Sequence, residues 1–247
     1  MQLKIKQIIK NICPIYKEPN NECSLESELL FGEYFYIKRY KDDWVLGNNY
    51  NDDYEGWIEL RQLAKRMPNQ YKVFFLQSLI YKKPNIKSKV LFNLFLGSKV
   101  TVVNTNNNWS EIRIDNENNT GFIHTKSILP YSFKINDWVS VAEKFLGVPY
   151  KWGGKSLLGI DCSGLVQTAI QLKDNYIPRN TKEQIKMNFD TVQNQNELKR
   201  GDLIFWDGHV GIMQNKKNII HANQYHMQVF SEPLFSAIER IKEKTKE

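Results

Sequence analysis

One cysteine and two histidines in the last third of the chain have the residue types that nucleophilic catalysis requires. Cys162 lies in the sequence Asp-Cys-Ser-Gly, His209 opens the sequence His-Val-Gly-Ile, and His221 follows. A thiol becomes nucleophilic when a neighbouring base removes its proton, and an imidazole base needs a further polar group to fix its tautomer. The chain order of nucleophile, base and orienter indicates covalent acyl chemistry.

A helix is predicted to position the cysteine. Apolar residues recur at helical spacing over residues 163–172, and Asp161 marks the start of this segment. Cys162 then falls in the first helical turn, where unpaired N–H groups and the positive end of the helix dipole favour a thiolate. Isolated cysteines are usually inert and buried, but this placement favours a reactive thiol.

A β-hairpin is predicted to position the histidines. Strands are expected at residues 203–206, 209–214 and 218–221, with Asp207-Gly208 as a two-residue turn. His209 begins one strand and His221 ends the next, so the two rings are expected to lie side by side. Metal ligation is the alternative, but one cysteine and two histidines lack the CxxC or HExxH spacing of zinc sites. We therefore expect no metal and no cofactor.

Two more segments of this region have local signals. A helix is expected through residues 139–146, with Asn136 or Asp137 as its cap and Gly147 at its end, and a glycine-containing loop follows over 148–160. Thr181 and Gln184 have the spacing of a capping box. A position lining the cleft is the alternative role for Thr181.

The first half of the chain contains an internal repeat. Tyr16, Gly32, Trp44 and the segment 56–58 recur as Tyr81, Gly97, Trp109 and the segment 121–123, all at an offset of 65. Short strands, near residues 33–39 and 44–47 and again near 99–103 and 109–114, alternate with polar turns. The pattern predicts two small β-barrels.

Two positions break the symmetry of the repeat. Tyr54 stands where the second copy has Asn119, and Glu33 stands where it has Ser98. Either residue is explained as a packing or surface residue of the first barrel. The alternative is that the first barrel alone lends these side chains to a neighbouring site.

Composition excludes several classes of protein. The 247 residues are 41% hydrophobic and 25% charged, as in ordinary folded proteins, and the net charge of +7 comes from dispersed lysines and arginines, which disfavours nucleic-acid binding. No segment has the roughly 20 apolar residues of a membrane span. Lysines at positions 4, 6 and 10 make the start of the chain a poor signal peptide. A cytoplasmic protein with reduced thiols and no membrane partner is expected.

The motifs of residues 137–222 resemble those of the NlpC-type, papain-like cysteine peptidases of bacterial cell-wall metabolism. The resemblance rests on the segments around Cys162, His209 and His221 and on residues 149–154, 179–184 and 200–205. Residues 1–130 resemble two bacterial SH3-like domains. The resemblance implies an α+β fold, with a papain-like catalytic domain at residues 131–247 behind SH3-like barrels at 1–66 and 67–130.

This combination of domains is similar to a subgroup that acts on free murein peptides. It implies hydrolysis of the γ-D-glutamyl bond to a diamino acid in murein stem peptides with a free N-terminal L-Ala, in cell-wall peptide recycling. By the same resemblance, the catalytic residues are the nucleophile Cys162, the base His209 and the orienter His221. The substrate-binding residues are Asp161 at the amine, Trp152 at the pocket wall, Thr181 at the stem peptide, Ser163, and Tyr54 and Glu33 from the first barrel.

Two other functions fit the same sequence. The cysteine–histidine pair would also serve an amidase or an acyltransferase, and a murein-binding protein could carry the catalytic fold as a vestige. Cleavage that requires a free amine would separate the first from the peptidase, and the intact set of Cys162, His209 and His221 argues against the second. The sequence does not choose between lysine and diaminopimelate at the scissile bond and does not indicate an oligomeric state.

Overall fold

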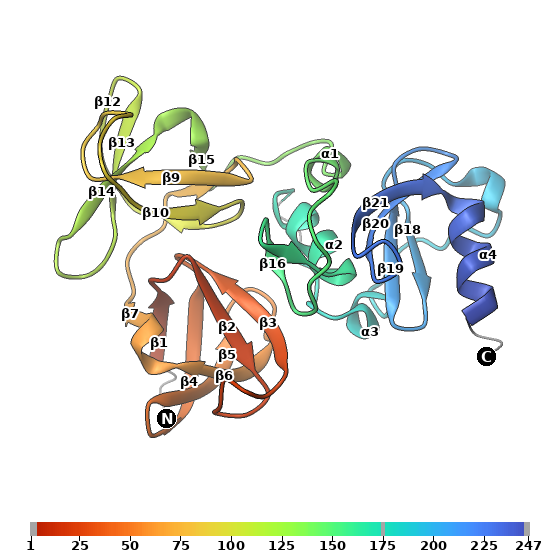
Figure 1. The fold of residues 1–247 in the computed structure, drawn as a ribbon, viewed down its shortest axis with the longest axis horizontal. Helices are drawn as coiled ribbons and strands as arrows, with labels where there is room; N and C mark the ends of the chain where they lie inside the picture. Colours follow the sequence, from red (N-terminus) through yellow and green to blue (C-terminus); the bar gives the residue numbers. More distant parts are fainter. Residues whose placement is uncertain (1–3, 174–175, 245–247) are drawn as a thin grey trace. The chain divides into compact units, whose positions relative to one another are not determined.

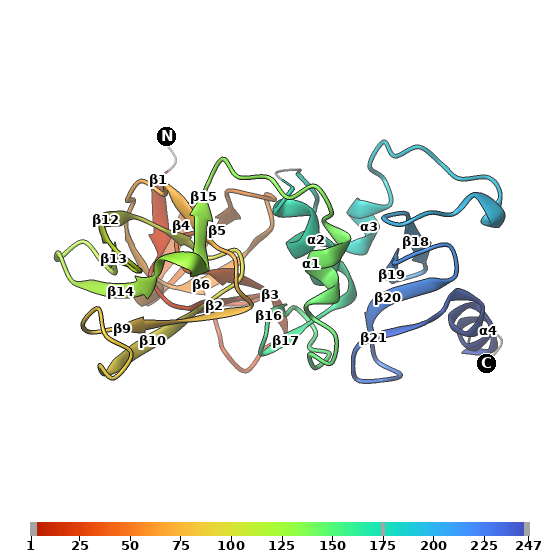
Figure 2. The same cartoon turned by 90° about the horizontal axis from the view of Figure 1, so that it is seen from above.

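The structure is a computed structural model that describes residues 4–173 and 176–244. It divides into two compact units, Met1–Lys134 and Ile135–Glu247. Unit 1 is built from strands, and unit 2 combines helices with a separate sheet (Figures 1 and 2). Among the described residues, no helix has both the length and the apolar character needed to cross a membrane.

The first barrel of unit 1 is a seven-stranded antiparallel sheet in the order β3-β2-β6-β5-β4-β1-β7. Alternate side chains of its strands point into a core that contains Ile8, Cys13 and Phe35. Burial raises the pKa of the Cys13 thiol well above its usual value. The strands are β1 (Lys4–Ile8), β2 (Ile12–Tyr16), β3 (Leu25–Leu30), β4 (Tyr34–Lys41), β5 (Trp44–Asn49), β6 (Glu55–Glu59) and β7 (Leu63–Lys65), with the 3-10 turn η1 (Leu60–Gln62) before β7.

The second barrel has a five-stranded sheet, β10-β9-β14-β13-β12, and a three-stranded sheet, β11-β8-β15. Its core includes Phe31, which comes from the loop between β3 and β4 of the first barrel. The two barrels therefore share part of one core. The strands are β8 (Tyr71–Val73), β9 (Gln77–Tyr81), β10 (Val90–Phe95), β11 (Lys99–Val100), β12 (Val102–Asn106), β13 (Trp109–Arg113), β14 (Thr120–His124) and β15 (Ile128–Pro130), with η2 (Thr125–Ser127) before β15.

The predicted repeat is confirmed in three dimensions. Tyr16 meets Trp44 edge-to-face with ring centroids 5.7 Å apart, and the residues 65 positions later, Tyr81 and Trp109, meet in the same way at 5.3 Å. Tyr16 also pairs with Trp57 across the sheet, as Tyr81 does with Phe122. The landmarks recur because they are the contacts that hold the module together.

One turn of the repeat explains the difference between Glu33 and Ser98. The Glu33 Oε2 accepts a hydrogen bond from the backbone N–H of Leu30 at 2.8 Å, and the Ser98 Oγ accepts the equivalent bond from Phe95 at 3.2 Å. Both side chains therefore close the same turn. The second carboxylate oxygen of Glu33 accepts a further bond from Asn51 at 2.8 Å, which a serine could not do.

Unit 2 places a four-stranded antiparallel sheet, β18-β19-β20-β21, between helices (Figures 1 and 2). Helices α1 and α2 lie on one side of this sheet, and α4 lies on the other. The elements are α1 (Val139–Glu143), β16 (Lys155–Ser156), β17 (Gly159–Ile160), α2 (Cys162–Gln171), α3 (Thr181–Gln184), η3 (Gln195–Glu197), β18 (Leu203–Trp206), β19 (His209–Met213), β20 (Asn218–Asn223), β21 (Gln228–Pro233) and α4 (Leu234–Lys244).

Three local expectations for unit 2 need correction. The helix expected over 139–146 ends at Glu143, because the backbone continues from there in tight turns that lead to Gly147 at a φ of +82°. The segment 148–160 is not an open loop, since it contains the small β16–β17 hairpin. The third strand of the hairpin region extends past His221 to Asn223.

The repeated turn gives a matched pair of glycine substitutions. Gly32 and Gly97 both have a positive φ, where any other residue costs about 1–2 kcal/mol. A Cβ at Gly32 would lie 2.0 Å from the Lys99 carbonyl oxygen, whereas at Gly97 the nearest atom is Leu30 Cδ1 at 3.6 Å. Gly32→Ala should therefore destabilise unit 1 by about 1–3 kcal/mol more than Gly97→Ala, the usual cost of overpacking. Hydrogen exchange of peptides from residues 4–130 measures this, and equal losses would contradict it.

Candidate active site

Cys162 is the first residue of α2, as predicted. Asp161 is the N-cap residue with extended backbone, and its Oδ1 accepts a hydrogen bond from the backbone N–H of Gly164 at 2.7 Å. This capping geometry satisfies one of the amides that a helix leaves unpaired at its start. The Cys162 side chain is buried, at 6% exposure.

Asp161 also forms a buried ion pair that the sequence did not indicate. Arg179, at 2% exposure, donates from Nη1 to Oδ1 at 2.9 Å and from Nη2 to Oδ2 at 2.6 Å. Ser163 Oγ donates to Oδ1 at 3.2 Å, and the Gly153 N–H donates to Oδ2 at 2.8 Å. Arg179 in turn donates to Ser163 Oγ at 2.9 Å. The pair fastens the start of α2, the glycine-containing loop and the segment before α3 to one another.

These contacts bear on the amine-binding role predicted for Asp161. The carboxylate accepts five hydrogen bonds within unit 2. A carboxylate has only about four lone-pair sites, and the guanidinium balances its charge. An amine would therefore have to displace one of the existing donors. Contact between Asp161 and the substrate amine stays a prediction.

The surroundings of Cys162 keep its thiol protonated. Burial, followed by the charge of Asp161, raises the pKa of Cys162 despite hydrogen bonds to the sulfur from the backbone N–H groups of Val210 and Ser163. Thr181 Oγ1 lies 3.9 Å from Sγ. The helix-start amide of Ser163 acts to lower this pKa, in the expected direction, but burial and the charge of Asp161 outweigh it. The thiol must lose its proton during the reaction.

The two histidines meet through a direct hydrogen bond. His209 Nε2 lies 2.8 Å from His221 Nδ1, across the antiparallel pair β19–β20. A Cβ on Gly211 would lie 2.5 Å from Ile219 Cδ1 and 3.3 Å from His221 Cβ, so this glycine leaves room for the Ile219 side chain beside His221. Burial, followed by the charge of His221, lowers the pKa of His209 to about 3. His209 is therefore a neutral base at physiological pH.

Strand β19 connects the histidine pair with the thiol. The amide that bonds Cys162 belongs to Val210, the residue next to His209 on β19. Burial, followed by the nearby Cys162, raises the pKa of Tyr150 to about 12. The phenol of Tyr150 therefore shares the buried surroundings of the thiol. Sequence reasoning noted Tyr150 only as part of a motif and gave it no role.

The capping box expected at Thr181 is wrong. Asn180 is the N-cap residue of α3 without a side-chain bond, and Thr181 is the first helical residue. Gln184 Nε2 donates to the Ser163 carbonyl at 3.1 Å and to the Pro178 carbonyl at 2.9 Å. Gln184 ties α3 to α2 instead of capping its own helix. Thr181 is thereby held beside the Cys162 thiol.

The remaining predicted site residues are Trp152, Glu33 and Tyr54. Trp152 is 62% exposed on the loop before β16. Glu33 and Tyr54 belong to unit 1, where the Tyr54 hydroxyl lies 3.2 Å from Glu26 Oε2. Their part in substrate binding stays a prediction.

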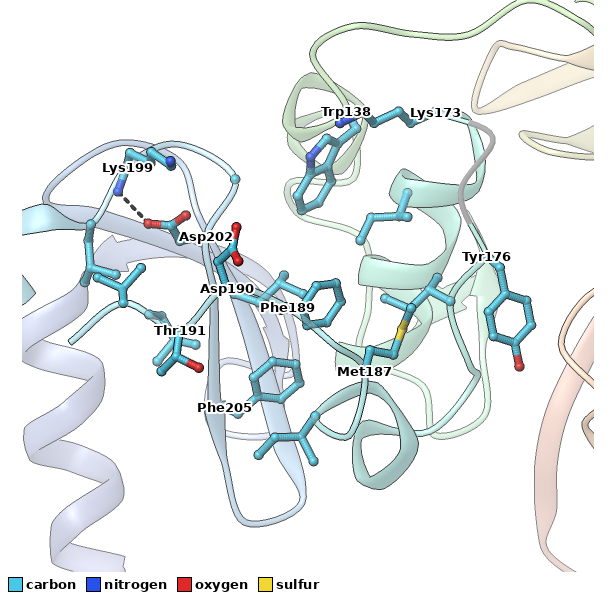
Figure 3. Close-up of a pocket in the computed structure, with 18 residues that line it drawn as sticks. Trp138, Lys173, Tyr176, Met187, Phe189, Asp190, Thr191, Lys199, Asp202 and Phe205 are labelled. Carbon is cyan, nitrogen blue, oxygen red and sulfur yellow. Dashed lines mark hydrogen bonds between the residues drawn. The ribbon is translucent and has the colours of Figure 1, made fainter. Parts of the chain in front are cut away.

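A largely apolar pocket in unit 2 involves none of the predicted site residues. Figure 3 shows Met187, Phe189 and Phe205 pointing into it, with Trp138 at one side. Lys199 N donates to Asp202 Oδ2 at its edge, at 2.8 Å. Its lining comes from β18, the end of α2 and the segment 185–202, not from the cysteine–histidine cluster.

The low pKa of His209 makes the stability of unit 2 depend on pH. The unfolded chain binds a proton near pH 6.5 and the folded chain only near pH 3, so stability is present above about pH 6.5 and is lost as the pH falls. His209→Asn should reduce this loss by up to about 1.4 kcal/mol per pH unit. Pulse proteolysis in urea, with mass-spectrometric identification of unit 2 fragments, measures both slopes between pH 7 and 5. Parallel slopes would contradict the assignment.

Comparisons with known proteins fit this arrangement. Residues 147–240 match the NlpC/P60 family, residues 15–63 match the bacterial dipeptidyl-peptidase SH3 domain, and residues 80–128 match the bacterial SH3 domain. The chain is 26% identical over 246 residues to dipeptidyl-peptidase 6 of Lysinibacillus sphaericus, an alignment covering 87% of this chain and 86% of that protein.

Two further matches extend over most of the chain. The γ-D-glutamyl-L-lysine dipeptidyl-peptidase of Bacillus subtilis is 24% identical over 218 residues, covering 80% of this chain and 72% of that protein. The crystal structure of an NlpC/P60 family protein from Bacillus cereus has a TM-score of 0.80 at 19% identity and covers 94% of each chain, which supports the fold. Residues 147–240 therefore belong to the NlpC/P60 family of cysteine peptidases, and two bacterial SH3 domains precede them in this chain.

Proposed function

We propose that this protein hydrolyses the γ-D-glutamyl–diamino acid bond of murein stem peptides that carry a free N-terminal L-Ala. The observation that carries the proposal is the combination of Cys162 at a helix start with the bonded pair His209–His221, joined through the Val210 amide of β19. Relatives named γ-D-glutamyl-L-lysine dipeptidyl-peptidase align with 80% and 87% of the chain, across its SH3 domains as well as its peptidase domain, which supports this substrate class.

The first chemical step is acylation of Cys162. The sulfur attacks the γ-carbonyl carbon of D-Glu while its proton passes to His209, whose low pKa leaves it unprotonated in the free enzyme. The new imidazolium then protonates the amine of the diamino acid, and the C–N bond breaks. The products are a thioester on Cys162 and the free diamino acid end of the substrate.

The second step restores the thiol. A water molecule gives a proton to His209 and attacks the thioester carbonyl, and the departing sulfur takes that proton back from the histidine. Both steps pass through a tetrahedral oxyanion. Backbone N–H groups at the start of α2, that of Cys162 included, are the proposed donors to it, and losing one such donor typically costs about 2.7–4 kcal/mol.

Substrate recognition in this proposal combines several side chains. Thr181, beside the thiol, contacts the stem peptide, and Trp152 supplies an exposed indole as a pocket wall. Asp161 is proposed to contact the substrate amine, and Ser163, bonded to both Asp161 and Arg179, lies beside it.

The proposed requirement for a free amine places the enzyme late in murein breakdown. Where the L-Ala nitrogen of a stem peptide is acylated, an amidase-type reaction must free it first. The product, a dipeptide of L-Ala and D-Glu, is small enough to be reused. This order supports a role in recycling cell-wall peptides.

Peptide hydrolysis tests the proposal directly. L-Ala-γ-D-Glu-L-Lys and L-Ala-γ-D-Glu-meso-diaminopimelate should be cleaved, whereas their N-acetylated forms should be cleaved at least about 100-fold more slowly, because acetylation removes the positive charge and two of the three donors of the amine that Asp161 is proposed to contact. Product formation is followed by liquid chromatography and mass spectrometry. Cys162→Ala should abolish cleavage.

The controls separate this function from the alternatives. Equal cleavage of free and acetylated peptides would remove the amine requirement and leave a general amidase. An absence of cleavage of every peptide, with wild-type protein retained on murein sacculi, would overturn the peptidase proposal in favour of a binding protein.

A further inference from the structure

His221 makes a second hydrogen bond on the side away from His209. Its Nε2 lies 2.8 Å from Oε1 of Glu232 on β21. His221 is 1% exposed and Glu232 is 7% exposed, so both groups are removed from water. Glu232 pairs with Ile219 across the β20–β21 ladder, two residues from His221 on the same face of the sheet. The register of the ladder places this carboxylate next to the ring.

Arg240 of α4 holds the other side of Glu232. Its Nη1 donates to Oε2 at 2.7 Å, and its Nη2 donates to Oε1. The Arg240 guanidinium also lies over the ring of Tyr225, 4.5 Å from its centroid. Burial acts to raise the pKa of Glu232, but the hydrogen bonds from Arg240 and His221 outweigh it and lower the pKa overall. Glu232 is therefore an acceptor only.

An acceptor at this position fixes the protons on both rings. The carboxylate requires the hydrogen of neutral His221 to sit on Nε2, which leaves Nδ1 as a lone pair. That lone pair requires His209 to donate from Nε2. His209 then has its own lone pair on Nδ1, the one ring nitrogen left for the Cys162 thiol. Without Glu232, the opposite tautomers of both rings become available. His209 would then carry its hydrogen on Nδ1, and that nitrogen could not accept the proton of Cys162.

We infer that Glu232 is a positioning residue, held by Arg240, that sets the tautomers of His221 and His209 so that His209 Nδ1 is the base for Cys162. The inference rests on the proposed function for its kinetic consequence, but its structural consequence is independent of any substrate. Glu232 acts on His209 through the orienting residue His221, and Arg240 of α4 holds Glu232 in place.

Substitution of Glu232 provides the kinetic test. In Glu232→Gln the side-chain amide presents an N–H donor to either Arg240 or His221. The tautomers of His221 and His209 are then no longer fixed. We expect kcat to fall by roughly 10- to 100-fold, the scale on which outer partners of a functional histidine act, with KM unchanged within about twofold. Glu232→Asp keeps a carboxylate and should lose less. Arg240→Gln keeps the acceptor on His221 and should also lose less than Glu232→Gln.

Arg200 supplies a matched control. Its guanidinium also bonds two carboxylates, Asp137 and Glu143, in the same unit but away from the histidines. Arg200→Gln removes an arginine ion pair of the same kind as Arg240→Gln does. Arg200→Gln should leave kcat unchanged. This variant therefore measures any general effect on kcat of losing an arginine ion pair in unit 2.

Nitrogen-15 NMR of the full chain measures the histidine tautomers directly. A purely structural role of Glu232 would leave these tautomers unchanged. The protein has four histidines, so assignment by single substitutions is practical. In the wild type at pH 7, Nδ1 of both His209 and His221 should be unprotonated and Nε2 protonated. In Glu232→Gln this pattern should become mixed or reversed, while in Arg200→Gln it should persist.

The outcomes distinguish the inference from the proposed function. Wild-type tautomers and kcat in folded Glu232→Gln would overturn the inference, as would a protonated His209 Nδ1 in the wild type. The expected tautomers and their change in Glu232→Gln would support it even if no stem peptide were cleaved, in which case the proposed function fails alone. If Glu232→Gln does not fold, the wild-type spectrum decides, because an unprotonated Nδ1 on both rings supports the inference and a protonated His209 Nδ1 overturns it.

Discussion

A carboxylate and a guanidinium, both almost fully removed from water, meet where three segments of unit 2 converge. Asp161 and Arg179 share two charge-assisted hydrogen bonds, at 2.9 and 2.6 Å. A buried pair of this kind adds little net stability compared with apolar packing, but removing one partner leaves an uncompensated charge and is costly. Its value here is geometric, because it holds the start of α2, the loop at Gly153 and the segment leading to Thr181 in one arrangement around Cys162.

A second pair of the same kind lies at the other end of the reactive cluster. Glu232 and Arg240 stand beyond His221 as Asp161 and Arg179 stand behind Cys162. Each carboxylate is paired with its own arginine, and the charge of Asp161 still raises the pKa of Cys162. The raised pKa of Cys162 and the lowered pKa of His209 both favour a neutral thiol and a neutral imidazole before substrate arrives.

Local signals predicted most of the elements but not the long-range partners. Asp161 as a cap, the hairpin at Asp207-Gly208 and the 65-residue repeat each depend on neighbouring residues or on a recurring pattern, and all are present. The entry of Phe31 into the second core depends on contacts between distant residues, and a single sequence carries no signal for it. The false capping box at Thr181 shows the converse, because Gln184 has a better partner in α2 than in its own helix.

Burial decides how the chemistry must start. A thiolate formed beforehand would have to be stabilised against desolvation, and the amides of Val210 and Ser163 do not suffice for that. In the proposed mechanism, proton transfer from Cys162 to His209 therefore accompanies attack on the carbonyl, when negative charge moves from sulfur to the oxyanion and its donors. In such a concerted step the base must already have its lone pair aimed at the thiol. A fixed tautomer is then a requirement of the reaction, and a carboxylate that can only accept hydrogen bonds is the simplest group that provides it.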